Sequence, residues 1–182
     1  MTNASRLEFA LLGLLQQQAQ SGYDLRKIFA NTPMRHFSDS PGSIYPALRR
    51  LEERGWITAK GESDGARKRQ AYRITPAGRR ALIDWLSQHI SREDIVHRQD
   101  ELMLRFAFLD GNVERDVTLR FMDQMVEVLE AYVQELRDFY KKFGAGIDRD
   151  TGRLAFESGI ISYEASLTWA RGARKHYRNN HS

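Results

Sequence analysis

The sequence contains no cysteine, and this absence excludes a disulfide framework, a thiol nucleophile and zinc sites with cysteine ligands. It also contains no apolar run that approaches the length of a membrane-spanning helix. Residues 1–6 lead into a short mixed helix without the cleavage pattern of a signal peptide. We therefore expect a soluble protein of the cytoplasm with no membrane partner.

Motifs for catalysis and metal binding are missing as well. The five histidines show no metal-ligand spacing, and the chain has no HExxH, GxSxG, GxGxxG or P-loop motif. Asp100 and Glu101 are adjacent carboxylates, but neighbouring residues on a helix point in different directions. The sequence therefore predicts neither an enzyme nor a metal or cofactor site.

Charged residues are plentiful but unevenly distributed. Residues 1–90 contain 14 Lys/Arg and 8 Asp/Glu, a net charge of +6, whereas residues 91–182 contain 14 and 16, a net charge of −2. Such asymmetry favours a front half that binds a polyanion and a back half with a different role. The alternative is that charge simply varies along the chain.

Residues 21–78 follow the order of a winged helix-turn-helix, a module that places one helix in the major groove of DNA. Ser21 can cap a first helix that ends at residues 31–33. A second helix begins near residues 40–43 and ends at Gly55, which serves as its C-cap.

A basic β-ribbon is expected directly after this second helix. Residues 56–59 and 71–75 read as two short strands around a turn-rich tip, and residues 67–69 form a cationic run beside that tip. Such a run can follow the DNA backbone or reach the minor groove, because neutralising phosphates supplies much of the affinity for DNA. Pro76 and Gly78 then open another helix.

The second helix of the motif supplies the expected base contacts. Ile44, Leu48 and Leu51 share one stripe that should face the core, which leaves the opposite face for DNA. Arg49 is the best candidate for reading a base edge, because arginine can pair bidentately with guanine. The alternative for the arginines of this helix is solvation or pairing with its own glutamates. The residues that we expect at the DNA are Ser43, Tyr45, Pro46, Arg49, Arg50, Arg67, Lys68, Arg69 and Tyr72.

Over about residues 5–90 the chain resembles the PadR family of bacterial transcriptional regulators. The motifs that carry the resemblance are residues 21–25, 42–48, 51–52 and 72–75, together with Gly78. The resemblance implies a dimeric winged-helix regulator, often a repressor, in which Tyr45 touches the DNA backbone and the cationic run lies in the wing. It also implies an effector, because many members are released from DNA by a small molecule such as a phenolic acid.

The back half is expected to form two long helices that pair with a second copy. Spacings of three and four residues define an a/d seam on a helix that Asn112 would cap and that ends at residues 144–146. A last helix over residues 156–170 completes an αα-hairpin, whose apolar surface is too wide for the two helices to cover alone. The alternative is an intramolecular bundle packed on the front domain. The expected dimerisation residues are Leu119, Met122, Val126, Leu129, Val133, Leu136, Tyr140 and Phe143.

A pocket for the implied effector has no signature of its own in the spacing of the chain. We expect it where the wing domain meets the C-terminal helices, with an apolar and aromatic lining that suits a small aromatic molecule. The alternative for each lining residue is ordinary core packing. The candidates are Phe106, Phe108, Tyr163 and Trp169.

These features predict a mainly α protein of two domains. A winged helix-turn-helix DNA-binding domain occupies residues 1–90, and a helical hairpin or coiled-coil dimerisation domain occupies residues 91–182. The predicted function is sequence-specific binding of double-stranded operator DNA, at an inverted repeat, to regulate transcription, more often as a repressor than as an activator. The alternative is a helical protein-interaction module without specific DNA binding, against which the basic wing argues.

Overall fold

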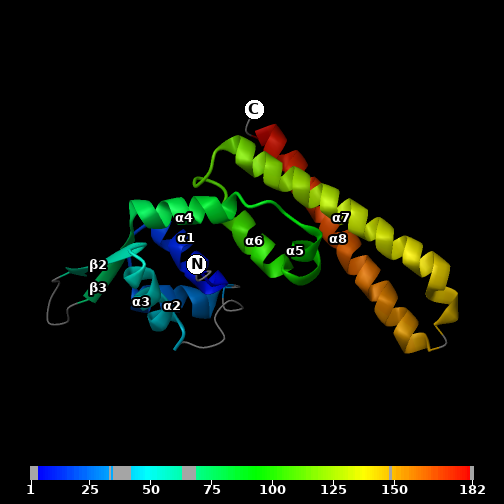
Figure 1. The fold of residues 1–182 in the computed structure, drawn as a ribbon, viewed down its shortest axis with the longest axis horizontal. Coiled ribbons are helices and arrows are strands. Elements are labelled where there is room, and N and C mark those ends of the chain that lie inside the picture. The colour runs from blue at the N-terminus through cyan, green and yellow to red at the C-terminus, as the bar shows by residue number, and fades with distance from the viewer. Residues whose placement is uncertain (1–3, 33, 35–41, 63–68, 148, 181–182) are drawn as a thin grey trace. The chain divides into compact units, whose positions relative to one another are not determined.

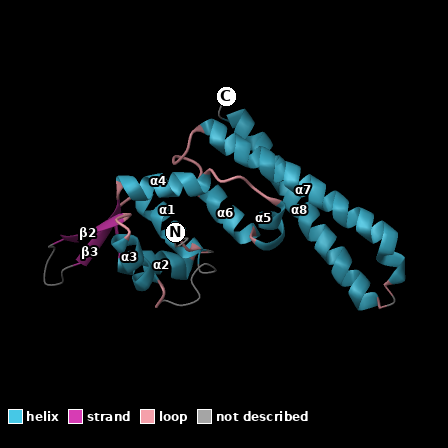
Figure 2. Ribbon diagram, viewed as in Figure 1, coloured by secondary structure: helices cyan, strands magenta, loops and turns pink. Residues whose placement is uncertain are grey.

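Figure 1 shows the computed structural model of the chain, which describes residues 4–32, 34, 42–62, 69–147 and 149–180. The chain divides into two compact units, residues 1–86 and residues 87–182. Helices dominate both units, and the described strands lie in the first (Figure 2). This architecture confirms the expected mainly α class with a small β-ribbon. None of the helices in the described part of the chain has the length and hydropathy that a membrane span requires.

The first unit is built around its N-terminal helix. Its elements are α1 (Arg6–Gln17), β1 (Gln20–Ser21), α2 (Gly22–Asn31), α3 (Ile44–Glu53), β2 (Ile57–Glu62), β3 (Arg69–Ile74) and α4 (Pro76–Leu86). α1 contacts α3, α4 and β3, and its residues from Leu7 to Leu15 are buried. Burial of this apolar helix therefore holds α3 and the ribbon of β2 and β3 to one core.

The helices of the first unit begin and end at the residues that the sequence indicates. The Ser21 hydroxyl accepts a hydrogen bond from the Asp24 N–H at 3.2 Å and so caps α2. Gly55 has a φ of +68°, and its N–H donates to the Glu52 carbonyl at 2.8 Å. This left-handed glycine ends α3 and turns the chain directly into the ribbon.

Gly78 allows the start of α4 to lie against the ribbon. A Cβ at this position would stand 2.1 Å from the carbonyl oxygen of Trp56, which is backbone and cannot swing away. Thr75 caps the same helix, because its hydroxyl accepts a hydrogen bond from the Gly78 N–H at 3.1 Å. The expected opening of a helix at Pro76 and Gly78 is therefore confirmed, with a close backbone approach as the reason for the glycine.

The sheet has one more strand than the sequence predicted. β2 pairs antiparallel with β3 in the register Ile57↔Ile74, as expected of the ribbon. β1 adds a short third strand on the other side of β3, in the order β1-β3-β2. A two-residue strand is defined by its partner and not by its own pattern, so the sequence contains no local signal for β1.

The second unit is an αα-hairpin with two short helices. Its elements are α5 (Arg92–His97), α6 (Gln99–Ala107), α7 (Arg115–Phe143), the 3₁₀ turn η2 (Gly144–Gly146) and α8 (Asp150–Asn180). α7 and α8 run side by side and are joined by a short connection (Figure 1). The expected hairpin is therefore confirmed, although α5 and α6 were not predicted.

The expected cap at Asn112 is wrong. The N-cap of α7 is Glu114, and the amide of Asn112 instead donates a hydrogen bond to the Phe108 carbonyl at 2.8 Å. Gly111, with a φ of +74°, turns the chain just before this residue. The side chain of Asn112 therefore satisfies a carbonyl at the end of α6 and takes no part in starting α7.

Arginines near the end of α8 pair with carboxylates of α7. Arg171 contacts Glu130 at 2.8 Å, and both Arg174 and Arg178 contact Asp123, at 3.3 and 2.8 Å. These pairs are largely exposed, so each one contributes little stability. They join the C-terminal part of α8 to α7 along the hairpin.

Candidate functional site

The candidate DNA-binding surface is the outward face of α3. Ile44, Leu48 and Leu51 are at most 1% exposed, which confirms the predicted inward stripe. Tyr45, Pro46 and Arg49 are exposed on the remaining surface of the helix. Ser43 stands at the N-cap, where the first N–H groups of the helix can meet an anion. The packing therefore leaves free the side that the sequence assigned to DNA.

Tyrosines from three elements gather beside this face. Tyr45 of α3 is 50% exposed, and its ring lies against the start of α2. Gly22 permits this approach, because a Cβ there would stand 2.7 Å from the Tyr45 Cε1 atom. A small cavity of about 190 Å³ results, and it is lined by Ser21, Gly22, Tyr23, Tyr45, Gln70 and Tyr72. Phenols and a hydroxyl in one concave patch suit hydrogen bonds to phosphate oxygens.

Tyr72 is held in its protonated form. Burial raises the pKa of its phenol, Glu52 and Tyr45 raise the same pKa further, and Arg49 opposes them. A tyrosine phenol keeps its proton at neutral pH without any shift, and the raised pKa extends this to more alkaline solution. Tyr72 can therefore donate a hydrogen bond to a phosphate, whereas a phenolate would repel it.

Arg50 has a partner that the sequence did not indicate. Its Nε donates to Oε1 of Glu8 at 2.6 Å, whereas the sequence offered only the glutamates of its own helix as partners. Glu8 lies in α1 and is 1% exposed. Arg50 was also expected to contact DNA, and that role now competes with a buried carboxylate.

The wing of the motif is only partly described. Arg67 and Lys68 lie outside the described residues, and Arg69 begins β3. The expected contacts of this run with DNA therefore stay predictions. In the described part of the ribbon, Lys60 and Arg73 are exposed cations outside the predicted set of DNA-contacting residues.

The predicted seam on α7 is divided between buried and exposed residues. Its middle part, Met122, Val126, Leu129 and Val133, is at most 4% exposed within a single chain. Leu119, Leu136 and Tyr140 are half-buried, and Phe143 is 49% exposed. The middle residues therefore already belong to the core of the second unit, through contacts of α7 with α5 and α8.

An uncharged exposed stripe runs along α8. Leu154 and Ile161 are 56% and 64% exposed. The spacing of three, four and seven residues puts further exposed small or uncharged side chains on the same face. The stripe consists of Leu154, Ser158, Ile161, Ala165, Thr168 and Gly172. The two large apolar side chains exposed on this face make it a candidate surface for a partner. We call it the α8 stripe.

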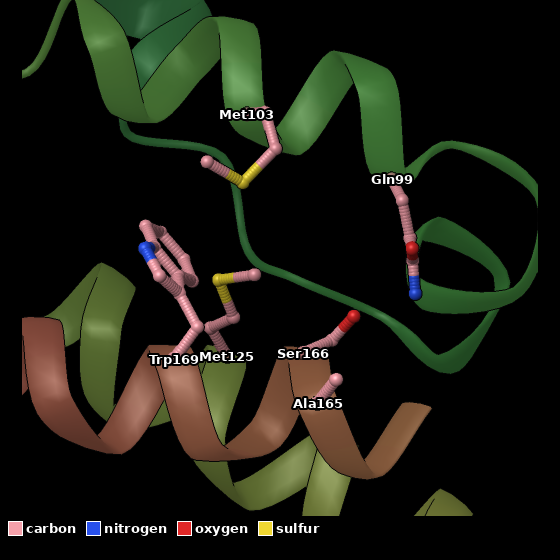
Figure 3. Close-up of a pocket in the computed structure, with 6 residues that line it drawn as sticks. All are labelled: Gln99, Met103, Met125, Ala165, Ser166 and Trp169. Atoms are coloured by element: carbon pink, nitrogen blue, oxygen red, sulfur yellow. The ribbon is translucent and has the colours of Figure 1, made fainter. Parts of the chain in front are cut away.

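The second unit also contains an apolar cavity of about 400 Å³ between α6 and the hairpin. Figure 3 shows Met103 of α6 pointing toward Met125 of α7 and Trp169 of α8. The polar groups of the lining are the amide of Gln99 and the hydroxyl of Ser166. Thioethers and an indole without a charged group suit a flat apolar or aromatic molecule.

One of the four residues expected at an effector pocket lines this cavity. That residue is Trp169, and Phe106 holds its ring edge-on with centroids 5.2 Å apart. Phe108 is 3% exposed, and the Tyr163 ring packs edge-on against Tyr132 at 4.7 Å. The lining methionines were missed, because spacing along one helix cannot show which residues of three helices converge.

Comparison with known proteins gives one family and several relatives. Residues 11–84 match the model of the Transcriptional regulator PadR-like family. The chain is 29% identical over 172 residues to the Negative transcriptional regulator PadR of Bacillus subtilis (strain 168), covering 94% of this chain and 91% of that protein. It is 29% identical over 146 residues to the Transcriptional regulator YqjI of Escherichia coli (strain K12), covering 79% and 66%. Among solved structures it is similar to the PadR-like transcriptional regulator BC1756 from Bacillus cereus, with 27% identity, coverage of 97% and 98%, and a TM-score of 0.44.

Proposed function

We propose that this chain is a PadR-like transcriptional regulator that binds a specific DNA operator as a homodimer, because residues 11–84 match the model of that family. The observation that carries the proposal is the outward face of α3. Its packing stripe is fully buried, while Tyr45, Pro46 and Arg49 are exposed beside a phenol-lined cavity. An exposed arginine between hydrogen-bond donors suits a major groove, in which the arginine reads a base and the donors hold phosphates.

Repression is the favoured direction of control. The relative that aligns over 94% of this chain is named as a negative regulator. A dimer bound across a promoter would compete with other proteins for the same DNA.

We place this activity in the cytoplasm, where bacterial DNA is transcribed, and we assign the protein no enzymatic role. A protein-interaction module without DNA binding is the second candidate, and the uncharged α8 stripe alone would support it.

A salt titration on the operator tests the proposal. Genomic footprinting first supplies the bound sequence, which should be an inverted repeat with half-sites about 34–36 Å apart. The logarithm of the affinity should then fall linearly with the logarithm of the salt concentration, because each phosphate contact releases counterions. Fluorescence anisotropy on labelled operator and on a scrambled duplex measures both affinities. Full-length protein with no salt-dependent affinity for either duplex would sink the proposal.

The cavity between α6 and the hairpin is the proposed effector site. Two residues beyond Met103 on the same helix, Arg105 is 3% exposed and donates a hydrogen bond to the Gln88 carbonyl. The Ile90 N–H in turn donates to the side chain of Gln124 at 3.1 Å. The segment that follows α4 is thus anchored to α6 and α7, and a ligand that displaces α6 would pull on it. Such a ligand must bind the free dimer more tightly than the DNA-bound dimer.

A charged substitution in this cavity should remove effector binding. We expect Met103→Glu to abolish binding of small aromatic acids without changing operator affinity, because the new carboxylate repels an anionic ligand and makes the apolar lining polar. Isothermal calorimetry measures the binding, and Trp169 provides a fluorescence signal inside the cavity. Ala107→Glu is the matched control, since Ala107 is exposed on α6 and is not among the lining residues of this cavity. If no compound both binds and changes operator affinity, control by protein abundance or by a protein partner becomes the better account.

A further inference from the structure

Glu8 is a buried carboxylate whose two oxygens are both engaged. Oε1 accepts a hydrogen bond from Nε of Arg50 at 2.6 Å. Oε2 accepts from Nη1 of Arg54 at 3.2 Å and from the N–H of Ser5 at 2.8 Å. The side chain of Glu8 is 2% exposed, whereas those of Arg50 and Arg54 are 47% and 24% exposed. One carboxylate of α1 therefore serves two arginines of the recognition helix.

The position of Glu8 is itself fixed from two sides. It is the third residue of α1 and forms a capping box with Ser5. At the other end, the Arg54 guanidinium lies 5.3 Å from the centre of the Trp56 ring, just beyond the left-handed turn at Gly55. The carboxylate therefore joins the start of α1 to the last turn of α3 across 42 residues of sequence.

We infer that Glu8 is a positioning residue that keeps Arg50 and Arg54 off the DNA phosphates and leaves Arg49 as the DNA-contacting cation of the described part of α3. The inference rests on the proposed DNA binding and deepens it. Arg49 and Arg50 are neighbours in sequence and both are exposed, yet only Arg50 is paired with Glu8. Moving Arg50 to a phosphate would take the hydrogen bond from Oε1 of a buried carboxylate and leave Arg54 as its remaining arginine partner, which is unfavourable for a buried charge.

The consequence of this arrangement is selectivity. Non-specific affinity depends on how many phosphates a protein neutralises, whereas base contacts distinguish one sequence from another. Two arginines withheld from phosphates lower the affinity for every duplex and leave the base contact unchanged. Glu8 would therefore raise the ratio of operator affinity to non-specific affinity, which decides occupancy in a genome.

Glu8→Gln tests the inference, because it keeps the shape of the side chain and removes its charge. We expect binding to a scrambled duplex to become tighter and its salt dependence steeper, by about 0.9 in the logarithmic slope for each arginine released. The ratio of operator affinity to non-specific affinity should fall. Adding Arg50→Ala to this variant should remove about half of the increase, because Arg54 stays released. A purely structural role for Glu8 would lower the melting temperature without steepening the slope, so a folded variant with an unchanged slope overturns the inference.

Arg50→Ala alone gives a second and independent readout, which also decides the matter if the Glu8 variant does not fold. We expect no change in the salt slope, since Arg50 is already withheld from DNA. A slope that falls by about 0.9 would mean that Arg50 contacts a phosphate in the wild type, and the inference would be wrong. Loss of the proposed function is distinguishable from both results, because wild-type protein would then show no salt-dependent affinity at all.

Discussion

Ile161→Glu is expected to give a folded monomer that binds the operator roughly 10²- to 10⁴-fold more weakly than the wild type. Ile161 is 64% exposed in the single chain and stands in the middle of the α8 stripe. A glutamate there is harmless to the protomer but would be buried and unpaired in an interface between two stripes. The affinity falls because a protomer bound at one half-site no longer keeps the second protomer close to the other half-site. Sedimentation equilibrium and anisotropy on the operator measure the two effects.

Two comparison variants make this result specific to the α8 stripe. Ile161→Leu keeps the apolar surface and should remain a dimer with wild-type operator affinity. Val126→Glu alters a residue of the predicted α7 seam that is 2% exposed, so it should unfold the second unit and yield no folded monomer. If Val126→Glu were a folded monomer while Ile161→Glu stayed dimeric, the interface would follow the α7 seam instead.

The division of the seam shows what a periodic pattern can and cannot predict. Spacings of three and four residues correctly indicated an apolar face on α7. Such a pattern predicts that the face is buried, but it does not show which helix or which second chain covers it. Val126 and Leu129 are covered within the same chain, where α7 contacts α5 and α8. The spacing of the α7 residues did not predict α5 and α6, so the whole seam was expected in a dimer interface, with an intramolecular bundle as the alternative. The exposed stripe on α8 became visible only once these contacts were known.

Local signals were sufficient for most of the first unit. The cap at Ser21, the turn at Gly55 and the inward stripe of α3 each depend on residues that are close in sequence. Their hydrogen bonds or packing faces can therefore be predicted from spacing alone. The resemblance of the same segment to one family agrees with the match of residues 11–84.

Long-range partners were beyond the reach of the sequence. The sequence indicated only glutamates of the same helix as partners for Arg50. Its partner in the structure is Glu8, which lies 42 residues away in another helix. The same limit applies to β1, whose pairing with β3 depends on residues about 50 positions further along the chain. Charge and periodicity show that a residue can pair, and only the fold shows with which residue.

Arg49→Ala should weaken operator binding by about 1–3 kcal/mol and reduce discrimination between the operator and a scrambled duplex. Arg49 is exposed on the outward face of α3, and its charge opposes the rise in the pKa of the Tyr72 phenol that burial causes. An arginine in this position can pair bidentately with a guanine in the major groove, and alanine removes both hydrogen bonds. Competition anisotropy with single-base variants of the operator would show which base pair loses its preference.

Arg49→Lys separates base reading from phosphate binding at the same position. Lysine keeps the positive charge but lacks the planar fork that pairs with a guanine edge. If Arg49 reads a base, the lysine variant should lose discrimination nearly as fully as the alanine variant, while the salt slope stays near the wild-type value. Wild-type discrimination in the lysine variant would show that Arg49 acts only as a charge. Arg80→Ala, which removes an exposed cation from α4, is the matched control and should change neither quantity.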